Sequence, residues 1–188
     1  MRAHHRSCVV CLAVFGVVGC GGSGEENSTQ AKPAKTYRTD HFTFVLPSGW
    51  VDTPSRSPEL QGDVPSGAAV APEGTAPSSV VAVLAYVVGD HEDDTAAGRR
   101  AWFEFYADTN DSAVTRAPTE IAFDGGVAIK GSLRWSDAVG NPVEVDFVRA
   151  MRGDVMYLIQ CQAEPVDRAA VTAGCESIVK SFRATPHP

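Results

Sequence analysis

Three of the five cysteines lie near the N-terminus, at positions 8, 11 and 20. Cys8 and Cys11 form a C-x-x-C pair, which is the spacing of a dithiol redox site or of half a zinc site. A redox pair of this kind opens a helix after a strand, and a zinc site needs four ligands. Neither context surrounds these residues. The spacing therefore favours neither redox nor metal chemistry here.

The same segment has the organisation of an export signal. Residues 1–7 carry Arg2 and Arg6 and no acidic residue, and residues 8–19 are an unbroken apolar run. As a helix this run would rise about 18 Å, which is too short to cross a ~30 Å hydrocarbon core. A positive start followed by such a run predicts a secretory signal peptide over residues 1–19.

The apolar run ends in Val17-Val18-Gly19-Cys20, which resembles the lipobox of bacterial lipoproteins. The resemblance implies cleavage before Cys20 and attachment of a diacylglycerol, with acyl chains such as palmitate, to this cysteine. The chain is then expected at the outer face of the cell membrane or in the cell envelope, with the membrane reached through lipid. An ordinary signal peptide with a fortuitous cysteine is the alternative.

The charge balance limits the partners of the exported chain. Removal of residues 1–19 leaves 14 basic against 23 acidic side chains, a net charge of −9. So acidic a surface disfavours nucleic-acid binding and electrostatic adhesion to anionic lipids. A protein partner in the envelope is the expectation that remains.

Composition divides the exported chain into a tether and one domain. Residues 20–36 are rich in Gly, Ser, Glu and Lys and predict a flexible tether. Residues 37–188 are long enough for a single domain with its own core. Residues 53–79 are rich in Pro, Ser and Gly and predict a long loop.

The periodicity of the domain predicts a mixed α+β fold. Strands are expected at 42–46 and 80–88, and from Pro118 alternating residues and a hairpin signal at Asp124-Gly125-Gly126 predict a four-stranded antiparallel meander. Helices are expected at 95–108 and 167–182, with Asp167 capping the second.

Two cysteines remain after export besides the lipidated one, Cys161 and Cys175. An even number in an exported chain predicts a disulfide, although two buried free thiols are the alternative. Cys161 shares the buried alternation of its strand, and Cys175 lies on the apolar stripe of the last helix. The disulfide would hold that helix to the sheet.

The start FTFVLPSGW and the end CESIVKSFRA resemble the LpqN-like lipoproteins of actinobacteria, whose fold is similar to that of PsbP. The resemblance implies an α/β/α sandwich with a curved, mainly antiparallel sheet and a C-terminal helix. It also implies a binding or accessory role, and it supplies no catalytic residues.

Other chemistry-bearing residues are better explained by structure. Residues 90–94 (DHEDD) do not complete a calcium loop, because Thr95 and Ala101 stand where glycine and glutamate are needed. Arg152-Gly153-Asp154 reads as a hairpin turn, and His41 is expected to be exposed. Since no nucleophile, metal-protease, phosphate-loop or dinucleotide motif is present, we expect no enzyme and no cofactor.

Two functions are compatible with these features. The first is a non-catalytic binding or accessory module that docks on an envelope partner. The second is a carrier that holds a lipid or other apolar ligand between sheet and helix. Trp102, Phe105 and Tyr106 form the candidate surface for either, because the first helix has more large rings than one core stripe needs, although plain core packing would also explain them.

Overall fold

The computed structural model describes residues 35–57, 60, 66–88, 93–136 and 140–185. All of them belong to the unit formed by residues 32–188. The predicted signal peptide, Cys20 and most of the predicted tether lie outside the described residues. The first strand begins at Lys35 and so includes the last two residues assigned to the tether.

The described segments alternate strands with two helices and one 3-10 turn. In chain order they are β1 (Lys35–Arg38), β2 (Phe42–Leu46), β3 (Trp50–Asp52), η1 (Pro54–Arg56), β4 (Ser66–Pro72), β5 (Val80–Val87), α1 (Ala96–Thr109), β6 (Ala113–Phe123), β7 (Gly126–Ser136), β8 (Pro142–Arg152), β9 (Val155–Ala163), α2 (Arg168–Ser181) and β10 (Arg183–Ala184).

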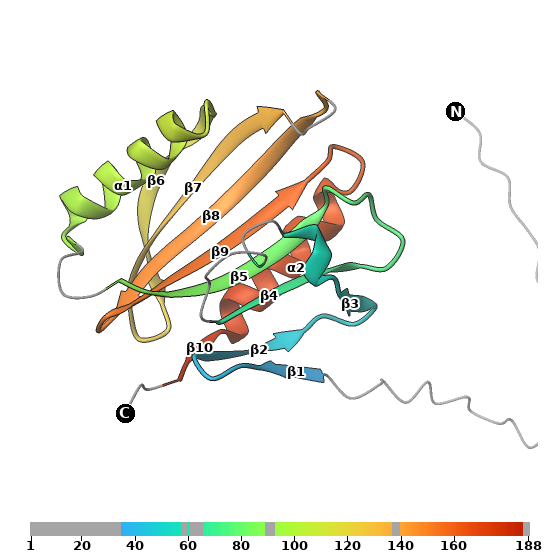
Figure 1. Cartoon of the computed structure of the whole chain (residues 1–188), viewed down its shortest axis with the longest axis horizontal. Helices are drawn as coiled ribbons and strands as arrows, with labels where there is room; N and C mark the ends of the chain where they lie inside the picture. The colour runs from blue at the N-terminus through green and yellow to red at the C-terminus, as the bar shows by residue number, and fades with distance from the viewer. Residues whose placement is uncertain (1–34, 58–59, 61–65, 89–92, 137–139, 186–188) are drawn as a thin grey trace, which may run out of the picture. The chain divides into compact units, whose positions relative to one another are not determined.

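These strands form two sheets, and every pairing in them is antiparallel (Figure 1). The larger sheet has seven strands in the order β3-β4-β5-β9-β8-β7-β6. The smaller has three, in the order β1-β2-β10. The predicted four-stranded meander is confirmed as β6 to β9.

The two helices cover opposite faces of the large sheet. Alternation along β5 shows this, because Val81 and Val83 join the core beneath α2 whereas Ala82 and Leu84 join the core beneath α1. Helix α2 packs on β9, β5, β4 and β2, and α1 packs on β6 and β7. The structure is therefore an α/β/α sandwich, as the resemblance to the LpqN-like lipoproteins implies.

A disulfide links Cys161 of β9 to Cys175 of α2 (Cα–Cα 6.0 Å). Both cysteines are buried, in the same core as Val171, Ile178 and Phe182 of the predicted stripe. The expected attachment of the last helix to the sheet is thus present in the structure.

The predicted loop at 53–79 is wrong over residues 66–72, which form β4. The segment SGAAVAP has few residues that favour strands, so its sequence alone does not indicate one. Pairing with β5 decides its structure, with Ala69 opposite Ala82 and Val70 opposite Val81. Ala68, Ala69, Val70 and Ala71 are all buried.

Three further local expectations are corrected. Asp167 makes no side-chain cap on α2, because its carboxylate accepts a hydrogen bond from the Ala76 backbone N–H at 3.0 Å. Strand β6 begins at Ala113 rather than at Pro118, since its N-terminal part pairs with β7 through two register shifts. His41 is buried rather than exposed, and its carbonyl oxygen accepts a hydrogen bond from the Tyr157 hydroxyl.

Replacing both cysteines by serine should lower the free energy of unfolding by about 3 kcal/mol, because the closed loop no longer restricts the unfolded chain. Denaturant titration of the oxidised wild type and the double variant measures this difference. Under reducing conditions the two curves should nearly coincide. Equal stability of the two oxidised proteins would contradict the role assigned to Cys161 and Cys175.

Candidate functional site

The three aromatic residues predicted to form a surface on α1 differ in their exposure. Trp102 and Tyr106 are half-buried against the sheet, whereas Phe105 is 69% exposed. The buried line of the helix runs through Arg99, Phe103 and Ala107, at steps of four residues. Phe105 lies three residues after Trp102 but points away from the buried line, so only Trp102 and Tyr106 of the three contact the sheet.

Aromatic packing fills the contact between α1 and the sheet. The Trp102 and Tyr106 rings stack at a centroid distance of 5.2 Å, and Tyr106 meets Phe147 of β8 edge-on at 5.0 Å. The buried guanidinium of Arg149 lies 5.1 Å from the centre of the Trp102 ring. These contacts are typical of a packed core.

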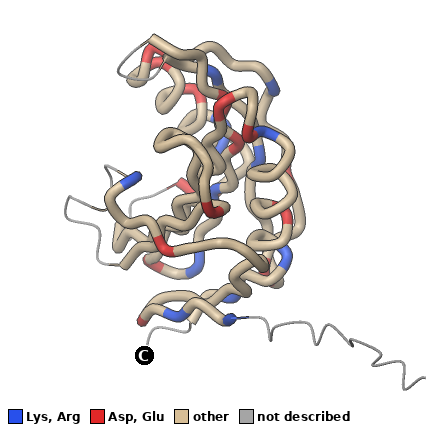
Figure 2. The backbone as a smooth tube through the Cα atoms, turned by 90° about the vertical axis from the view of Figure 1, so that its right-hand side faces the viewer, with Lys and Arg blue, Asp and Glu red and all other residues tan. Residues whose placement is uncertain are grey.

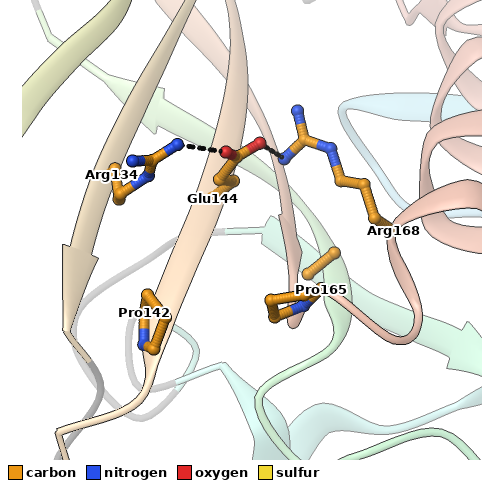
Figure 3. A pocket seen from close by; sticks show the side chains of 6 residues that line it. Arg134, Pro142, Glu144, Pro165 and Arg168 are labelled. Atoms are coloured by element: carbon orange, nitrogen blue, oxygen red, sulfur yellow. Dashed lines mark hydrogen bonds and ion pairs between the residues drawn. The ribbon is translucent and has the colours of Figure 1, made fainter.

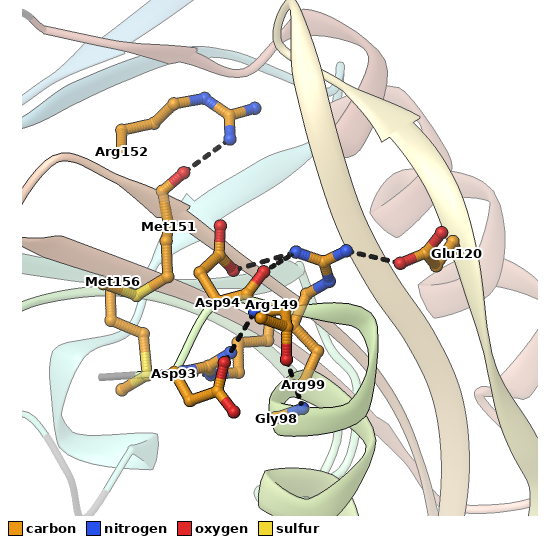
Figure 4. A network of polar contacts seen from close by, with 10 residues as sticks. Asp93, Asp94, Gly98, Arg99, Glu120, Arg149, Met151, Arg152 and Met156 are labelled. Carbon is orange, nitrogen blue, oxygen red and sulfur yellow. Dashed lines mark hydrogen bonds and ion pairs between the residues drawn. The ribbon is translucent and has the colours of Figure 1, made fainter. Parts of the chain in front are cut away.

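A polar network fixes the start of α1 (Figure 4). The Thr95 hydroxyl caps the helix by accepting from Gly98 N–H at 3.1 Å. The buried guanidinium of Arg99 makes ion pairs with Asp94 at 3.1 Å and with Glu120 of β6. Asp93 and Asp94 therefore serve the helix start. Across the described residues, no three His, Cys, Asp or Glu side chains gather as a metal site requires.

A second charged cluster lies on the sheet face that bears α2. Asp146 of β8 stands directly opposite Cys161, whose side chain is bonded to α2, so both side chains share that face. Ser132 of β7 stands opposite Asp146, and two residues along, Arg134 stands opposite Glu144. The face is therefore apolar on β5 and β9, beneath α2, and polar at the end of β7 and β8 that holds these residues, whereas Ala128, Val148 and Ala150 further along belong to the core.

These residues surround a pocket of about 320 Å³ at the point where the sheet meets the start of α2 (Figure 3). Glu144 lies between two guanidinium groups: Arg134 Nη2 is 2.6 Å from its Oε1, and Arg168 Nη1 is 2.9 Å from its Oε2. Pro142, Ala163 and Pro165 complete the lining. The result is a recess with charged groups above apolar walls.

Asp146 contacts Arg168 and Ser132 beside the pocket. Its carboxylate is buried and accepts a hydrogen bond from the Ser132 hydroxyl at 2.5 Å, and Arg168 Nη2 lies 3.5 Å from its other oxygen. Arg168 is thereby held by two carboxylates. A guanidinium has five N–H donors in a planar fork, so an arginine placed in this way can also receive an anionic group of a ligand.

The surrounding charges shift the titration of Glu144. The hydrogen bond from Arg134 lowers the pKa of this carboxyl below its ordinary value, and the charges of Arg168, Arg134 and Arg116 act in the same direction. Partial burial opposes the shift. Glu144 therefore remains ionised and paired at neutral pH.

One residue, Arg168, could have indicated this pocket from the sequence, although the hydrophobic periodicity does not. Arg168 is the first residue of α2, where the helix dipole disfavours a positive charge. A cation in that position indicates nearby carboxylates. Which carboxylates they are depends on the register between β7 and β8, across a connection whose residues 137–139 lie outside the described ones.

The remaining candidate sites either have a structural role or lie outside the described residues. Arg152-Gly153-Asp154 joins β8 to β9, and Gly153 has the positive φ of 61° that the turn requires. Cys20 lies outside the described residues. Of the acidic residues 90–94, only Asp93 and Asp94 are described.

Comparison with known proteins identifies the fold and no more. No protein-family model and no curated protein matches the sequence. The solution structure of the PsbP protein of Synechocystis (CyanoP) covers 90% of this chain and 99% of its own, with a TM-score of 0.59 at 14% identity. LpqN of Mycobacterium tuberculosis, a protein involved in cell envelope biogenesis, covers 84% of this chain and 88% of its own, with a TM-score of 0.51 at 14% identity.

A protein of unknown function from Pseudomonas aeruginosa, PA94, gives a TM-score of 0.53 at 14% identity over 82% of this chain and 98% of its own. The class that these likenesses define is the PsbP-like α+β sandwich. This chain has that fold, with a mainly antiparallel sheet between its two helices. Sequence identities this low make the likeness one of fold alone.

Replacing Glu144 by Gln should reduce stability at about pH 7 by ~1 kcal/mol or less, because partly exposed ion pairs contribute little. The folded-state pKa of Glu144 is lowered, so its contribution is present above the ordinary value of 4.5 and is lost as the pH falls through the folded pKa. Urea titrations at several pH values measure this dependence. The exposed Glu176, replaced in the same way, is the control, and a pH-independent difference at Glu144 would contradict the assignment.

Proposed function

We propose that this protein is a lipid-anchored, extracytoplasmic accessory module that binds a protein partner in the cell envelope and catalyses no reaction. The Val17-Val18-Gly19-Cys20 sequence supports the anchor and the location. The PsbP-like fold is compatible with an accessory role. The described helices are too short or too polar to span a membrane, and the proposed attachment requires lipid alone.

The binding role rests on the charged face of the sheet beside α2, which consists of Arg134, Glu144, Asp146 and Arg168. Its guanidinium and carboxylate groups are held by paired strands and by one another, so they are preorganised before any partner arrives. Arg134 and Arg168 border a pocket whose walls are apolar. Charged groups around a small apolar recess are suited to recognising a protein segment.

The LpqN neighbour supports the same cellular setting. That protein is involved in cell envelope biogenesis, and the sequence of this chain independently suggests an envelope lipoprotein.

The carrier function is the weaker alternative. It would place an apolar ligand between the sheet and a helix. In the contact beneath α1, Trp102, Tyr106 and Phe147 pack on one another at ring distances of 5.0 to 5.2 Å. Protein atoms occupy that space, which favours the accessory module.

Lipid attachment at Cys20 is tested by Cys20→Ser in the native host. This variant should lose metabolic labelling by a palmitate analogue and should accumulate as an unprocessed or released form, because the thiol that accepts diacylglycerol is absent. Cys11→Ser is the matched control and should be labelled and processed like the wild type. A Cys20→Ser protein that is still processed and membrane-bound would overturn the anchor.

The binding role is tested by a photo-crosslinking residue placed at exposed positions. At Thr119 of β6, on the charged face, we expect a discrete crosslinked envelope protein. At Ala173 on the outer side of α2 we expect none, and Phe105 reports separately on the outer side of α1. If no position in the intact envelope gives a specific product, the accessory module is the wrong function.

A further inference from the structure

The charged face has an excess of positive charge although the chain as a whole is acidic. In the register of the sheet, Arg116 of β6 stands opposite Ser132, and Lys130 of β7 lies two residues from Ser132 on the same face. With Arg134 and Arg168 they bring four positive groups to a region that holds two carboxylates, Glu144 and Asp146. The whole chain has a net charge of −7.

Both carboxylates are already engaged by Arg134 and Arg168. Arg116 and Lys130, by contrast, have no ion-pair partner within the described residues. Figure 2 shows basic and acidic positions interspersed along the backbone. Two adjacent cations that make no direct ion pair within the described residues are therefore a local feature of this face and not a consequence of overall charge.

On the basis of the proposed function, the geometry points to an acidic, extended segment of the partner protein as the occupant of this face. Lys130, Ser132 and Arg134 follow one another at alternate positions of β7, so successive side chains are about 6.8 Å apart and Lys130 is about 13.6 Å from Arg134. An extended segment with carboxylates at alternate residues has the same spacing. Its first and third carboxylates can meet Lys130 and Arg134, while Arg116, opposite Ser132, approaches the middle one from β6.

The occupant is held by side chains rather than by joining the sheet. Strand β6 is the edge strand next to this face, but Pro118 lacks an N–H and the pairing of β6 with β7 shifts register twice between Val114 and Thr119. Irregularities and prolines of this kind block the addition of a further strand. Charge complementarity therefore sets the specificity and the salt dependence of binding.

Other anionic partners fit less well. Nucleic acid or an anionic membrane presents an extended negative surface, which the net charge of −7 on the chain would repel. A single acidic segment needs to meet only the face itself. An acidic segment of a protein is therefore the occupant that the charge distribution favours.

The test is binding of a fluorescein-labelled peptide of alternating Glu and Gly to the full chain, purified in detergent from its host. The same peptide with Gln in place of Glu is the probe control. The Glu peptide should bind and the Gln peptide should not, and the affinity should fall steeply as salt is added. Arg116→Glu with Lys130→Glu should weaken binding of the Glu peptide by about tenfold or more.

The matched control variant is Arg38→Glu with Arg100→Glu, two exposed positions away from this face. It changes the net charge by the same amount, so it should retain most of the binding if the face is the site. Arg116→Gln with Lys130→Gln removes the charges without reversing them and should give an intermediate loss. Unfolding curves of all variants check that each is folded.

Equal loss in the two charge-reversal variants, or no binding of the Glu peptide, would overturn the inference. So would stronger competition by dihexanoyl phosphatidylglycerol than by unlabelled Glu peptide, because the face would then be a lipid headgroup site. These outcomes are separable from the crosslinking result. A specific crosslinked partner with no peptide binding refutes only the acidic segment, whereas peptide binding without any crosslinked partner refutes only the accessory module.

Discussion

A seven-stranded sheet is much wider than a single helix can cover, and the rest of the structure depends on this mismatch. Strands lie about 4.8 Å apart, whereas a helix with its side chains is about 10 Å wide. Helix α2 therefore shields β9, β5 and β4 and leaves β6 to β8 partly uncovered on the same face. Side chains at the uncovered end of those strands must be compatible with water, which is why the rows through Ser132 and Arg134 change from apolar on β9 to charged on β8.

The position of α2 also determines where the charged residues meet. The Cys161–Cys175 disulfide and the buried stripe of Val171, Ile178 and Phe182 fix the helix on β9. Its first residue, Arg168, then lies beside Glu144 and Asp146 of the adjacent strand. The carboxylates compensate a charge that the helix dipole disfavours. The position of α2 on β9 thus determines both the packing of the core and the site of the polar pocket.

Sequence reasoning succeeded where a residue's environment follows from local periodicity. The meander, the continuous apolar strand β5 and the stripe containing Cys175 all have repeating patterns that indicate their burial. It failed at β4, because an alanine-rich segment forms a strand only when β5 is there to pair with it. It left the role of the α1 rings open, because the ring content of α1 does not state which of its faces meets the sheet.

The sequence by itself determined the fold class, the order of most elements and the pair of cysteines that face one another, because these follow from hydrophobic period and turn chemistry. Only the tertiary structure decided that Arg134, Glu144 and Arg168 form one pocket beside Arg116 and Lys130. These residues come from three strands and a helix. Their proximity depends on strand register and on where α2 lies across the sheet, and a one-residue change of register would move each strand residue to the opposite face.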